Sequence, residues 1–244
     1  MASTIRLVTY NIHKCRGWDR RVSPERVARV LTSLDADCIA LQEVVDGSPV
    51  GKPNQAREIC EALGNNYKTV FGRTRDLRGA DYGNATLTRL PVARSENYNI
   101  TWKHREPRGC LRTDLHLGNG SLLHVFNVHL GTSYMERRAQ GPLLLSDRML
   151  NHAAHTGPRV ILGDFNEWTR GITSELMAKQ FRKIYLHQQR KRGSFPGPLP
   201  VLELDHVYYD DQLGLVHFEL VRTRLSLIAS DHLPLLAEFQ IKSG

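Results

Sequence analysis

Two segments of the sequence repeat the same order of elements, and this repeat constrains the fold more than any other feature. Residues 8–13 and residues 125–129 each run from apolar side chains into a terminal histidine. Each segment is followed by a loop, an amphipathic helical pattern and an apolar strand pattern that ends in an acid. Two similar strand–helix–strand halves predict two sheets packed face to face, with helices on the outside.

Short apolar or alternating segments bounded by turn residues predict the strands. They cover residues 5–11, 38–42, 69–72, 84–88, 111–116, 122–129, 160–163, 204–208 and 235–241. Helices are predicted over residues 24–34, 136–155 and 174–181. Ser23 is the expected N-cap of the first helix, and Pro24 its first residue. The predicted fold class is therefore α/β.

A chain of 244 residues can bury about three quarters of its unfolded surface in one core. No low-complexity segment divides it, and we expect a single domain over residues 1–244. The Pro- and Gly-rich segment 193–200 follows the basic run Arg190, Lys191 and Arg192 and is too short for a flexible linker, so we expect an ordered surface loop. No apolar run approaches the roughly 20 residues that a membrane-spanning helix requires.

The cysteines and the charge balance indicate the setting in which the protein works. Cys15, Cys38, Cys60 and Cys110 show no metal-ligand spacing, and no charged-then-apolar leader precedes the first strand. We therefore expect reduced thiols in a cytoplasmic, monomeric protein. Lys and Arg number 33 and Asp and Glu 25, for a net charge of +8. A basic surface favours polyanionic partners such as nucleic acid, phospholipid headgroups or phosphorylated metabolites.

Polar and ionisable side chains gather where the predicted strands end. These residues are Asn11, His13, Gln42, Glu43, His129, Asp164, Asn166, Asp205, His206, Asp231 and His232. A side chain at a strand end is held by rigid backbone and still reaches the rim of the sheet, which suits a preorganised site. Convergence from several strand ends is typical of a catalytic cleft.

The residue types in this group suit phosphate chemistry. Three carboxylates with an asparagine and no cysteine are hard oxygen ligands, which favours Mg²⁺ or Mn²⁺ over Zn²⁺. The adjacent pair Asp231 and His232 suits a carboxylate on a metal beside an imidazole on the substrate, and Asp205 could hold that imidazole in one tautomer. A divalent ion, histidines and a positioning acid together predict hydrolysis of a phosphate ester.

The order of the motifs resembles that of the endonuclease/exonuclease/phosphatase superfamily. The matching motifs are TYNIH (9–13), LQEV (41–44), YGNA (82–85), NVHLG (127–131), GDFN (163–166), LDHV (204–207) and SDHLP (230–234). The resemblance covers nearly the whole chain, and GDFN and SDHLP are its most specific parts. It implies the DNase I-like fold, a four-layer α–β–β–α sandwich of two mixed sheets.

The resemblance also implies a role for each matched residue. Glu43 would bind Mg²⁺, with Asn11 beside it and Asp231 near or on the metal. Asp205 would orient His232 on the scissile phosphate.

The remaining matched residues would complete the catalytic set. Asp164 would position or deprotonate the attacking water, and Asn166 would stabilise the pentacovalent phosphorus. His129 would be the second active-site histidine, as in the DNase I, sphingomyelinase and phosphoinositide-phosphatase branches. Asn84 and Arg108 would contact the substrate phosphate.

Two positions depart from the resemblance. His13 stands where the abasic-site endonuclease branch carries a metal-binding aspartate. The acid that pairs with the second histidine has no clear match, and Asp76 and Asp81 are the candidates.

The leading functional prediction is a Mg²⁺-dependent phosphodiesterase or nuclease that cleaves DNA or RNA. Basic loops would track the phosphates, and the candidates are Arg20, Arg21, Arg73, Arg75, Arg78, Arg137, Arg138, Arg182 and Lys183. The first alternative is a phospholipid or phosphoinositide phosphodiesterase or phosphatase with peripheral membrane contact through the apolar segment 195–200. The second alternative is a binding module without catalysis. Trp18, Trp102 and Trp168 could stack on a base or a lipid, or simply cover core.

Overall fold

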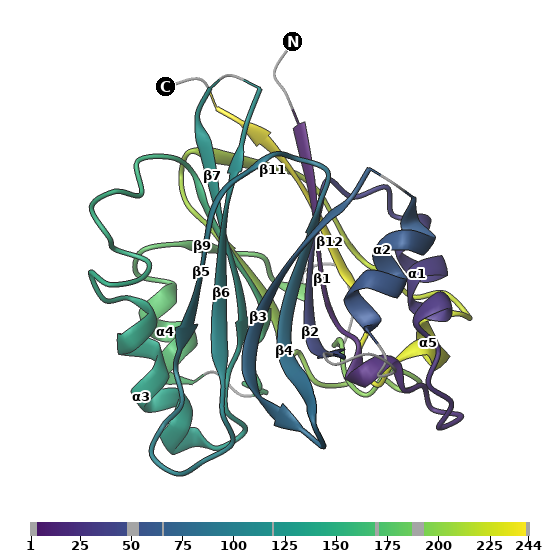
Figure 1. The fold of residues 1–244 in the computed structure, drawn as a ribbon. Coiled ribbons are helices and arrows are strands. Elements are labelled where there is room, and N and C mark those ends of the chain that lie inside the picture. Colours follow the sequence, from purple (N-terminus) through teal and green to yellow (C-terminus); the bar gives the residue numbers. More distant parts are fainter. Residues whose placement is uncertain are drawn as a thin grey trace.

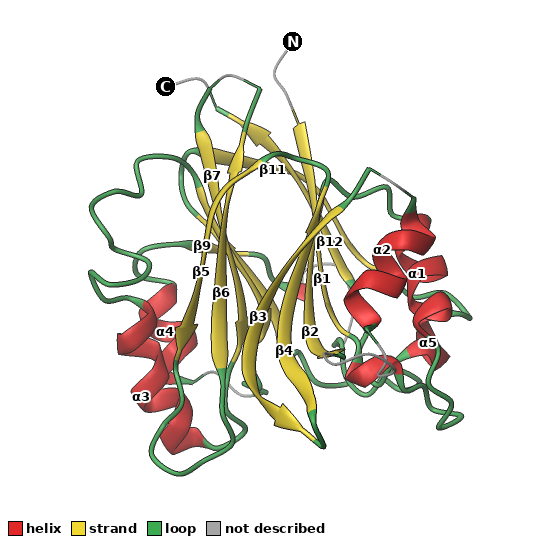
Figure 2. Ribbon diagram, in the orientation of Figure 1, coloured by secondary structure: helices red, strands yellow, loops and turns green. Residues whose placement is uncertain are grey.

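The computed structural model describes residues 4–47, 54–64, 66–118, 120–168, 171–186 and 193–242. These residues form two sheets of six strands that pack face to face, and helices cover the outer face of each sheet (Figure 1, Figure 2). The four-layer sandwich predicted from the sequence is confirmed. The basic run at Arg190, Lys191 and Arg192 lies outside the described residues.

The first sheet has the strand order β11–β12–β1–β2–β4–β3. Its strands are β1 (Thr4–Asn11), β2 (Cys38–Asp46), β3 (Lys68–Leu77), β4 (Ala80–Thr88), β11 (Leu213–Leu220) and β12 (Leu235–Ile241). Its outer side carries the helices α1 (Pro24–Thr32), α2 (Gln55–Leu63) and α5 (Ser226–Ala229) (Figure 1). The turn η1 (His13–Cys15) follows β1 directly. Strands β1 and β2 are parallel and the other neighbours are antiparallel.

The second sheet has the strand order β5–β6–β7–β8–β10–β9. Its strands are β5 (Val92–Asn99), β6 (Gly109–His116), β7 (Leu122–His129), β8 (Arg159–Asp164), β9 (Arg182–Lys183) and β10 (Asp205–Tyr209). Helices α3 (Tyr134–Leu144) and α4 (Ile172–Met177) cover its outer face (Figure 1). Strands β7 and β8 are parallel. The sequence repeat thus corresponds to the units β1–α1–β2 and β7–α3–β8.

Both faces of each sheet are buried because successive side chains of a strand point to opposite faces. Leu7, Val125 and Leu162 belong to the core between the two sheets. Val8 points the other way and joins Leu31 of α1 in a core outside the first sheet. Strands β7 and β8 pack in the same manner against α3 and α4.

The first predicted helix and its N-cap are confirmed, and the helix ends at Thr32, two residues before its predicted end. The side-chain oxygen of Ser23 accepts a hydrogen bond from the backbone N–H of Arg26 at 3.2 Å, and Pro24 occupies the first helical position. The predicted C-terminal half of the helix over residues 136–155 is wrong, because α3 ends at Leu144. Ser146 and Asn151 donate to the carbonyls of Leu143 and Leu145, so these side chains satisfy the last turn.

Several elements were not predicted. They are the strands β5, β9 and β11 and the helices α2 and α5. The edge strand β5 is largely exposed and polar, so it lacks the apolar alternation that marks a half-buried strand. In the part of the chain described here, no helix is long and apolar enough to cross a membrane. All four cysteines are free thiols.

A buried polar cluster lies on the outer face of the second sheet, away from the strand ends that carry Asn11, His129 and Asp164. Asp114 accepts a hydrogen bond from Arg112 at 3.0 Å, and one of its oxygens lies 2.7 Å from Nδ1 of His124. Arg112 also contacts Nε2 of His155 at 2.9 Å. Burial, with the nearby charges of His124 and Arg112, lowers the pKa of His155 to about 4.

This pKa predicts an acid-sensitive contribution to stability. The unfolded chain binds a proton at His155 near the ordinary pKa of 6.5, whereas the folded protein binds it only near pH 4. Protonation therefore favours unfolding between these values, and the stability contributed by neutral His155 is lost as the pH falls. As the pH is lowered from 6.5 to 4, we expect the melting temperature of the wild type to fall more than that of the His155→Gln variant. Thermal unfolding of both proteins at a series of pH values measures the difference, and a constant difference would contradict the assignment.

Candidate active site

Four strands bring the candidate residues to one end of the sandwich. Asn11 ends β1, His129 ends β7, Asp164 ends β8 and Asp205 begins β10. His129 and Asp205 each pair in register with Asp164, from its two sides. The amide nitrogen of Asn11 donates to Asp164 at 2.9 Å and so joins the two sheets at this end. The predicted convergence of these strand ends is confirmed.

Glu43 reaches the same place by a different route. The sequence predicts a strand that stops at Gln42, but β2 continues to Asp46. The register between β2 and β4 shifts between Leu41 and Val44, and Glu43 has a φ of 58°. A β-bulge that contains a residue with left-handed backbone conformation redirects that residue's side chain. Here that residue is Glu43, the expected metal ligand.

A pocket of 240 Å³ opens at this end of the sandwich, and we call it the catalytic pocket. The candidate residues that line it are Glu43, Arg108, His129, Asp164, Asn166, Asp231 and His232. Thr132, Trp168, Phe195, Leu202 and Leu204 complete the wall. Asn11 and Asp205 do not line the catalytic pocket. Asn11 contacts Asp164, and Asp205 contacts His232.

His232 is held by a buried carboxylate. Its Nδ1 lies 2.7 Å from Oδ2 of Asp205, and the same oxygen accepts a hydrogen bond from the hydroxyl of Ser194. Burial alone would lower the pKa of His232, but the charges of Asp205 and Asp164 raise it to about 10. The imidazole is therefore charged at neutral pH, with Nε2 at 3.7 Å from Asp164.

Asp164 occupies the centre of the group. Its Oδ1 accepts a hydrogen bond from the backbone N–H of Asn166 at 2.8 Å. Its Oδ2 lies 3.6 Å from Nε2 of His129 and 3.7 Å from Nε2 of His232. Burial, opposed by the charge of His232, raises the pKa of Asp164 to about 6. This carboxylate can therefore exchange a proton near neutral pH.

His129 faces a guanidinium. Nη1 of Arg108 lies 2.9 Å from Nε2 of His129, and Nη2 of Arg108 donates to Glu106 at 2.9 Å. Burial and the charge of Arg108 lower the pKa of His129 well below its ordinary value, so the ring is neutral. Neither proposed partner acid is near: Asp76 accepts from the N–H of Gly79, and Asp81 pairs with Arg73.

Asn84 does not line the catalytic pocket. It is buried between the sheets, and its amide nitrogen lies 3.2 Å from the carbonyl oxygens of both Gly109 and Asn127. Asn127 in turn donates to the carbonyls of Leu41 and Ala85. Asn84 thus links the two sheets in this structure, and its expected contact with phosphate has no support from the geometry.

The oxygen ligands fit a divalent ion of the Mg²⁺ type. Glu43 and Asp231 both present carboxylates to the catalytic pocket. Among the described residues no three His, Cys, Asp or Glu side chains form a complete metal cage. Mg²⁺ is commonly held by one or two carboxylates and retains its other waters, so two carboxylates are sufficient.

Basic side chains lie beside both carboxylates. Lys14 lies in a left-handed turn with φ 59°, and its ammonium pairs with Glu43. Burial would raise the pKa of Glu43, but the basic groups beside it, His129 and Lys14, lower it to about 2. Nδ1 of His13 lies 3.6 Å from Asp231. The demand for positive charge at this point supports a cation site, and the sequence patterns did not single out Lys14.

Several arginines expected to track phosphates have other partners. Arg137 is buried and donates to the carbonyls of Gly131 and Thr132 at 3.1 and 2.6 Å, so it supports the wall of the catalytic pocket. Arg182 pairs with Asp211. Such arginines contribute to the net charge but not to a free phosphate-binding surface.

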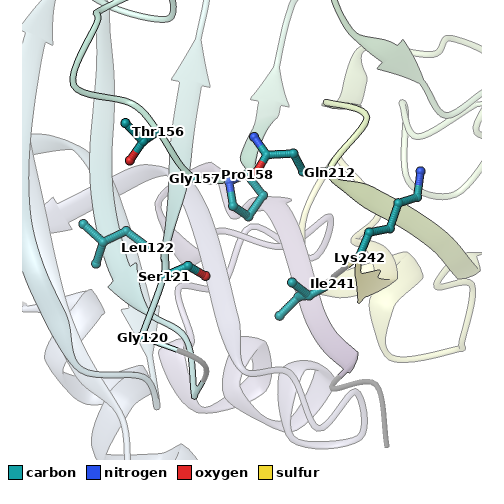
Figure 3. Close-up of a pocket in the computed structure, with 9 residues that line it drawn as sticks. All are labelled: Gly120, Ser121, Leu122, Thr156, Gly157, Pro158, Gln212, Ile241 and Lys242. Carbon is teal, nitrogen blue, oxygen red and sulfur yellow. The ribbon is translucent and has the colours of Figure 1, made fainter. Parts of the chain in front are cut away.

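A larger pocket of 370 Å³ lies at the opposite end of the sandwich, where β7 begins (Figure 3). Its wall consists of Gly120, Ser121, Leu122, Thr156, Gly157, Pro158, Gln212, Ile241 and Lys242. Lys242 is the ionisable member of this wall, and its ammonium donates to the carbonyl of Asp211. Among the residues that the structure describes, this wall holds no carboxylate, histidine or cysteine, so volume alone does not indicate a reaction there.

The chain is similar to known proteins over nearly its whole length. A sequence profile described as the Endonuclease/Exonuclease/phosphatase family matches residues 8–232. The uncharacterized protein YbhP of Escherichia coli (strain K12) is 27% identical over 251 residues, which covers 98% of this chain and 97% of YbhP.

Solved structures share the fold. An endonuclease/exonuclease/phosphatase from Beutenbergia cavernae has a TM-score of 0.79 and 20% identity, covering 98% of this chain and 72% of that chain. A mannosyl-6-phosphatase from Bacteroides thetaiotaomicron has a TM-score of 0.76 and 18% identity, covering 96% and 99%. At these identities the likeness shows the fold alone, and it confirms the expected DNase I-like class.

Proposed function

Because the chain belongs to the endonuclease/exonuclease/phosphatase family, we propose that it is a Mg²⁺-dependent phosphodiesterase that cleaves DNA or RNA. The family consists of metal-dependent phosphoesterases. The observation that carries the proposal is the placement of His232, Asp164 and Arg108 around one pocket. This wall combines a charged acid, a carboxylate of raised pKa and a guanidinium, which suits attack on a phosphate ester.

His232 and Asp164 would move protons in the reaction. With Nδ1 held by Asp205, the charged ring of His232 can donate from Nε2 to a phosphoryl oxygen or to the leaving group. Asp164, with a pKa of about 6, would position the attacking water and accept its proton. The opposite charge states of the two groups support these separate roles.

The remaining residues would bind the phosphate. Arg108 and Asn166 line the pocket and can stabilise the charge that develops on the phosphoryl oxygens. Neutral His129 stays oriented by Arg108. Glu43 and Asp231, with Asn11 nearby, would hold the divalent ion, which supplies charge neutralisation at the phosphate when bound.

A phospholipid diester is the second candidate substrate, because the pocket mouth is apolar. Trp168, Leu199 and Val201 are 51%, 69% and 51% exposed. Trp168 lines the catalytic pocket, and the other two lie between Phe195 and Leu202, which also line it. Exposed apolar side chains beside a cleft suit contact with a lipid surface.

A metal-supplemented activity panel tests the proposal. It compares plasmid DNA, single-stranded RNA, sphingomyelin, phosphoinositides and bis-p-nitrophenyl phosphate, each with Mg²⁺, with Mn²⁺ and with EDTA. We expect cleavage of DNA or RNA that EDTA abolishes and that weakens steeply with salt. Preferential hydrolysis of sphingomyelin or phosphoinositides would favour the second candidate. Hydrolysis of none of them would favour a binding module.

Metal binding gives a prediction that does not depend on turnover. We expect Mg²⁺ to raise the free energy of unfolding of the wild type by about 2.7 kcal/mol at 100 times its dissociation constant. The Glu43→Gln variant removes a charged ligand and should lose this stabilisation. Thermal unfolding with and without Mg²⁺ measures the effect, with Glu175→Gln, an exposed glutamate of α4, as the matched control. An equal Mg²⁺ response in wild type and Glu43→Gln would contradict the assigned ligand.

A further inference from the structure

A second pocket adjoins the catalytic pocket, and we call it the aromatic pocket. Its volume is 280 Å³, and its wall includes Arg16, Trp18 and Arg20 from the loop after η1. Phe195 and Asp231 line both pockets, so the two lie side by side. A group bound in the aromatic pocket would therefore belong to the same molecule as the phosphate at His232, or lie directly beside it.

Hydrogen bonds hold the loop that carries Trp18 in one conformation. The N–H of Gly17 donates to the carbonyl of Arg21 at 3.1 Å. The guanidinium of Arg26 donates to Asp19 at 2.7 and 3.1 Å and to the Arg21 carbonyl at 2.9 Å. The N–H of Trp18 donates to the carbonyl of Ile228 at 3.2 Å, which fastens the loop to α5. A ligand would thus meet a preformed surface and would not have to order this loop.

The fold covers only half of the side chain of Trp18. It is 50% exposed although its backbone is fastened, and it stands in the wall of a concave pocket. A large ring in this position offers a flat face for stacking, and bases stack on aromatic side chains whatever their sequence. Phe195 supplies a second ring in the same wall.

The charges around Trp18 favour a phosphorylated ligand. Neither Arg16 nor Arg20 forms an ion pair with any residue that the structure describes, whereas Arg26 in the same region is bonded to Asp19. Two guanidiniums beside an aromatic wall match a planar base joined to phosphate. A lipid surface would instead contact protruding apolar residues, as at Leu199.

We propose that the aromatic pocket binds the nucleobase of the nucleotide next to the scissile phosphate. Trp18 provides the stacking face, and Arg16 and Arg20 bind the following phosphate. The inference rests on the proposed function. It narrows the substrate class to nucleotides that carry a base on the side of the scissile phosphate that faces the aromatic pocket. A pocket of this volume, just below the usual range of about 300–1,000 Å³ for ligand sites, suits one ring system and not a long chain.

A binding experiment tests the pocket without turnover. The chain has 3 tryptophans, so the double variant Trp102→Phe, Trp168→Phe leaves Trp18 as the single reporter. We expect adenosine 3′,5′-bisphosphate to quench its fluorescence saturably, and inorganic phosphate at equal ionic strength to leave it unchanged. Adding Arg16→Gln and Arg20→Gln should raise the dissociation constant. Absence of quenching, equal quenching by inorganic phosphate, or a response only to phosphatidylglycerol vesicles would overturn the proposal.

A kinetic experiment tests the same pocket in the reaction. Trp18→Ala should raise KM for a dinucleotide about 5- to 150-fold, the range expected for one stacked base. Trp18→Phe should retain most of the affinity, and Trp102→Phe is the control. Neither Trp18 variant should change hydrolysis of an analogue in which hydrogen replaces the base. An equal loss on the analogue would overturn the proposal. If the wild type hydrolyses no phosphodiester, the proposed function fails, and the fluorescence titration still decides whether the pocket binds a nucleotide.

Discussion

Replacement of His232 by asparagine is expected to lower kcat for a phosphodiester by about 10²- to 10⁴-fold. The substitution removes the charged donor that lies 3.7 Å from Asp164 and leaves no group at this position that can transfer a proton. Steady-state hydrolysis of bis-p-nitrophenyl phosphate at saturating Mg²⁺ measures the loss. Activity within a few fold of wild type would contradict the assigned role.

The fold should survive this substitution. Asp205 keeps its hydrogen bond from Ser194, so its buried carboxylate is not left without a partner. His217 provides the matched control, because its side chain is 52% exposed on β11 and lines none of the pockets described. We expect His217→Asn to retain wild-type kcat and both variants to show cooperative thermal unfolding.

Replacement of Asp114 by alanine is expected to reduce the free energy of unfolding by about 3–5 kcal/mol. The carboxylate lies between Arg112 and His124, and all three side chains are buried. Its removal leaves a buried guanidinium without its closest counter-charge. Because a domain is stable by only about 5–15 kcal/mol, this is a large fraction of the total, and urea unfolding would reveal it.

This variant should separate stability from chemistry. Asp114 pairs with His124 in the β6–β7 ladder, whereas Gly109 and His129 pair at the pocket end of the same ladder. At temperatures where the variant is folded, we expect wild-type kcat. Asp147→Ala, at an exposed position after α3, should change the free energy of unfolding by no more than about 0.5 kcal/mol. A loss below about 1 kcal/mol for Asp114→Ala would show that the ion cluster is not required.

Local sequence was sufficient for most of the sandwich. The apolar runs of β1, β7 and β8 and the capped start of α1 are encoded within a few residues, and each was predicted. Local sequence was insufficient where an element is determined by tertiary contacts or lies in solvent, because such an element has no regular pattern of apolar residues. Strand β5 shows little apolar alternation, and α3 ends early because side chains of the following loop satisfy its carbonyls.

By itself the sequence determined the two-sheet architecture and the set of polar residues at one end of it. Both follow from patterns of a few neighbouring residues. The alternation of apolar and polar residues determines which face of a strand is buried, and the last residue of a strand lies at the edge of the sheet where the strand ends. Only the tertiary structure decided which groups meet. It turned Glu43 inward at a bulge, placed Arg108 against His129, and used Asn84 to join the sheets. These outcomes depend on contacts between residues distant in the chain, and no local pattern contains them.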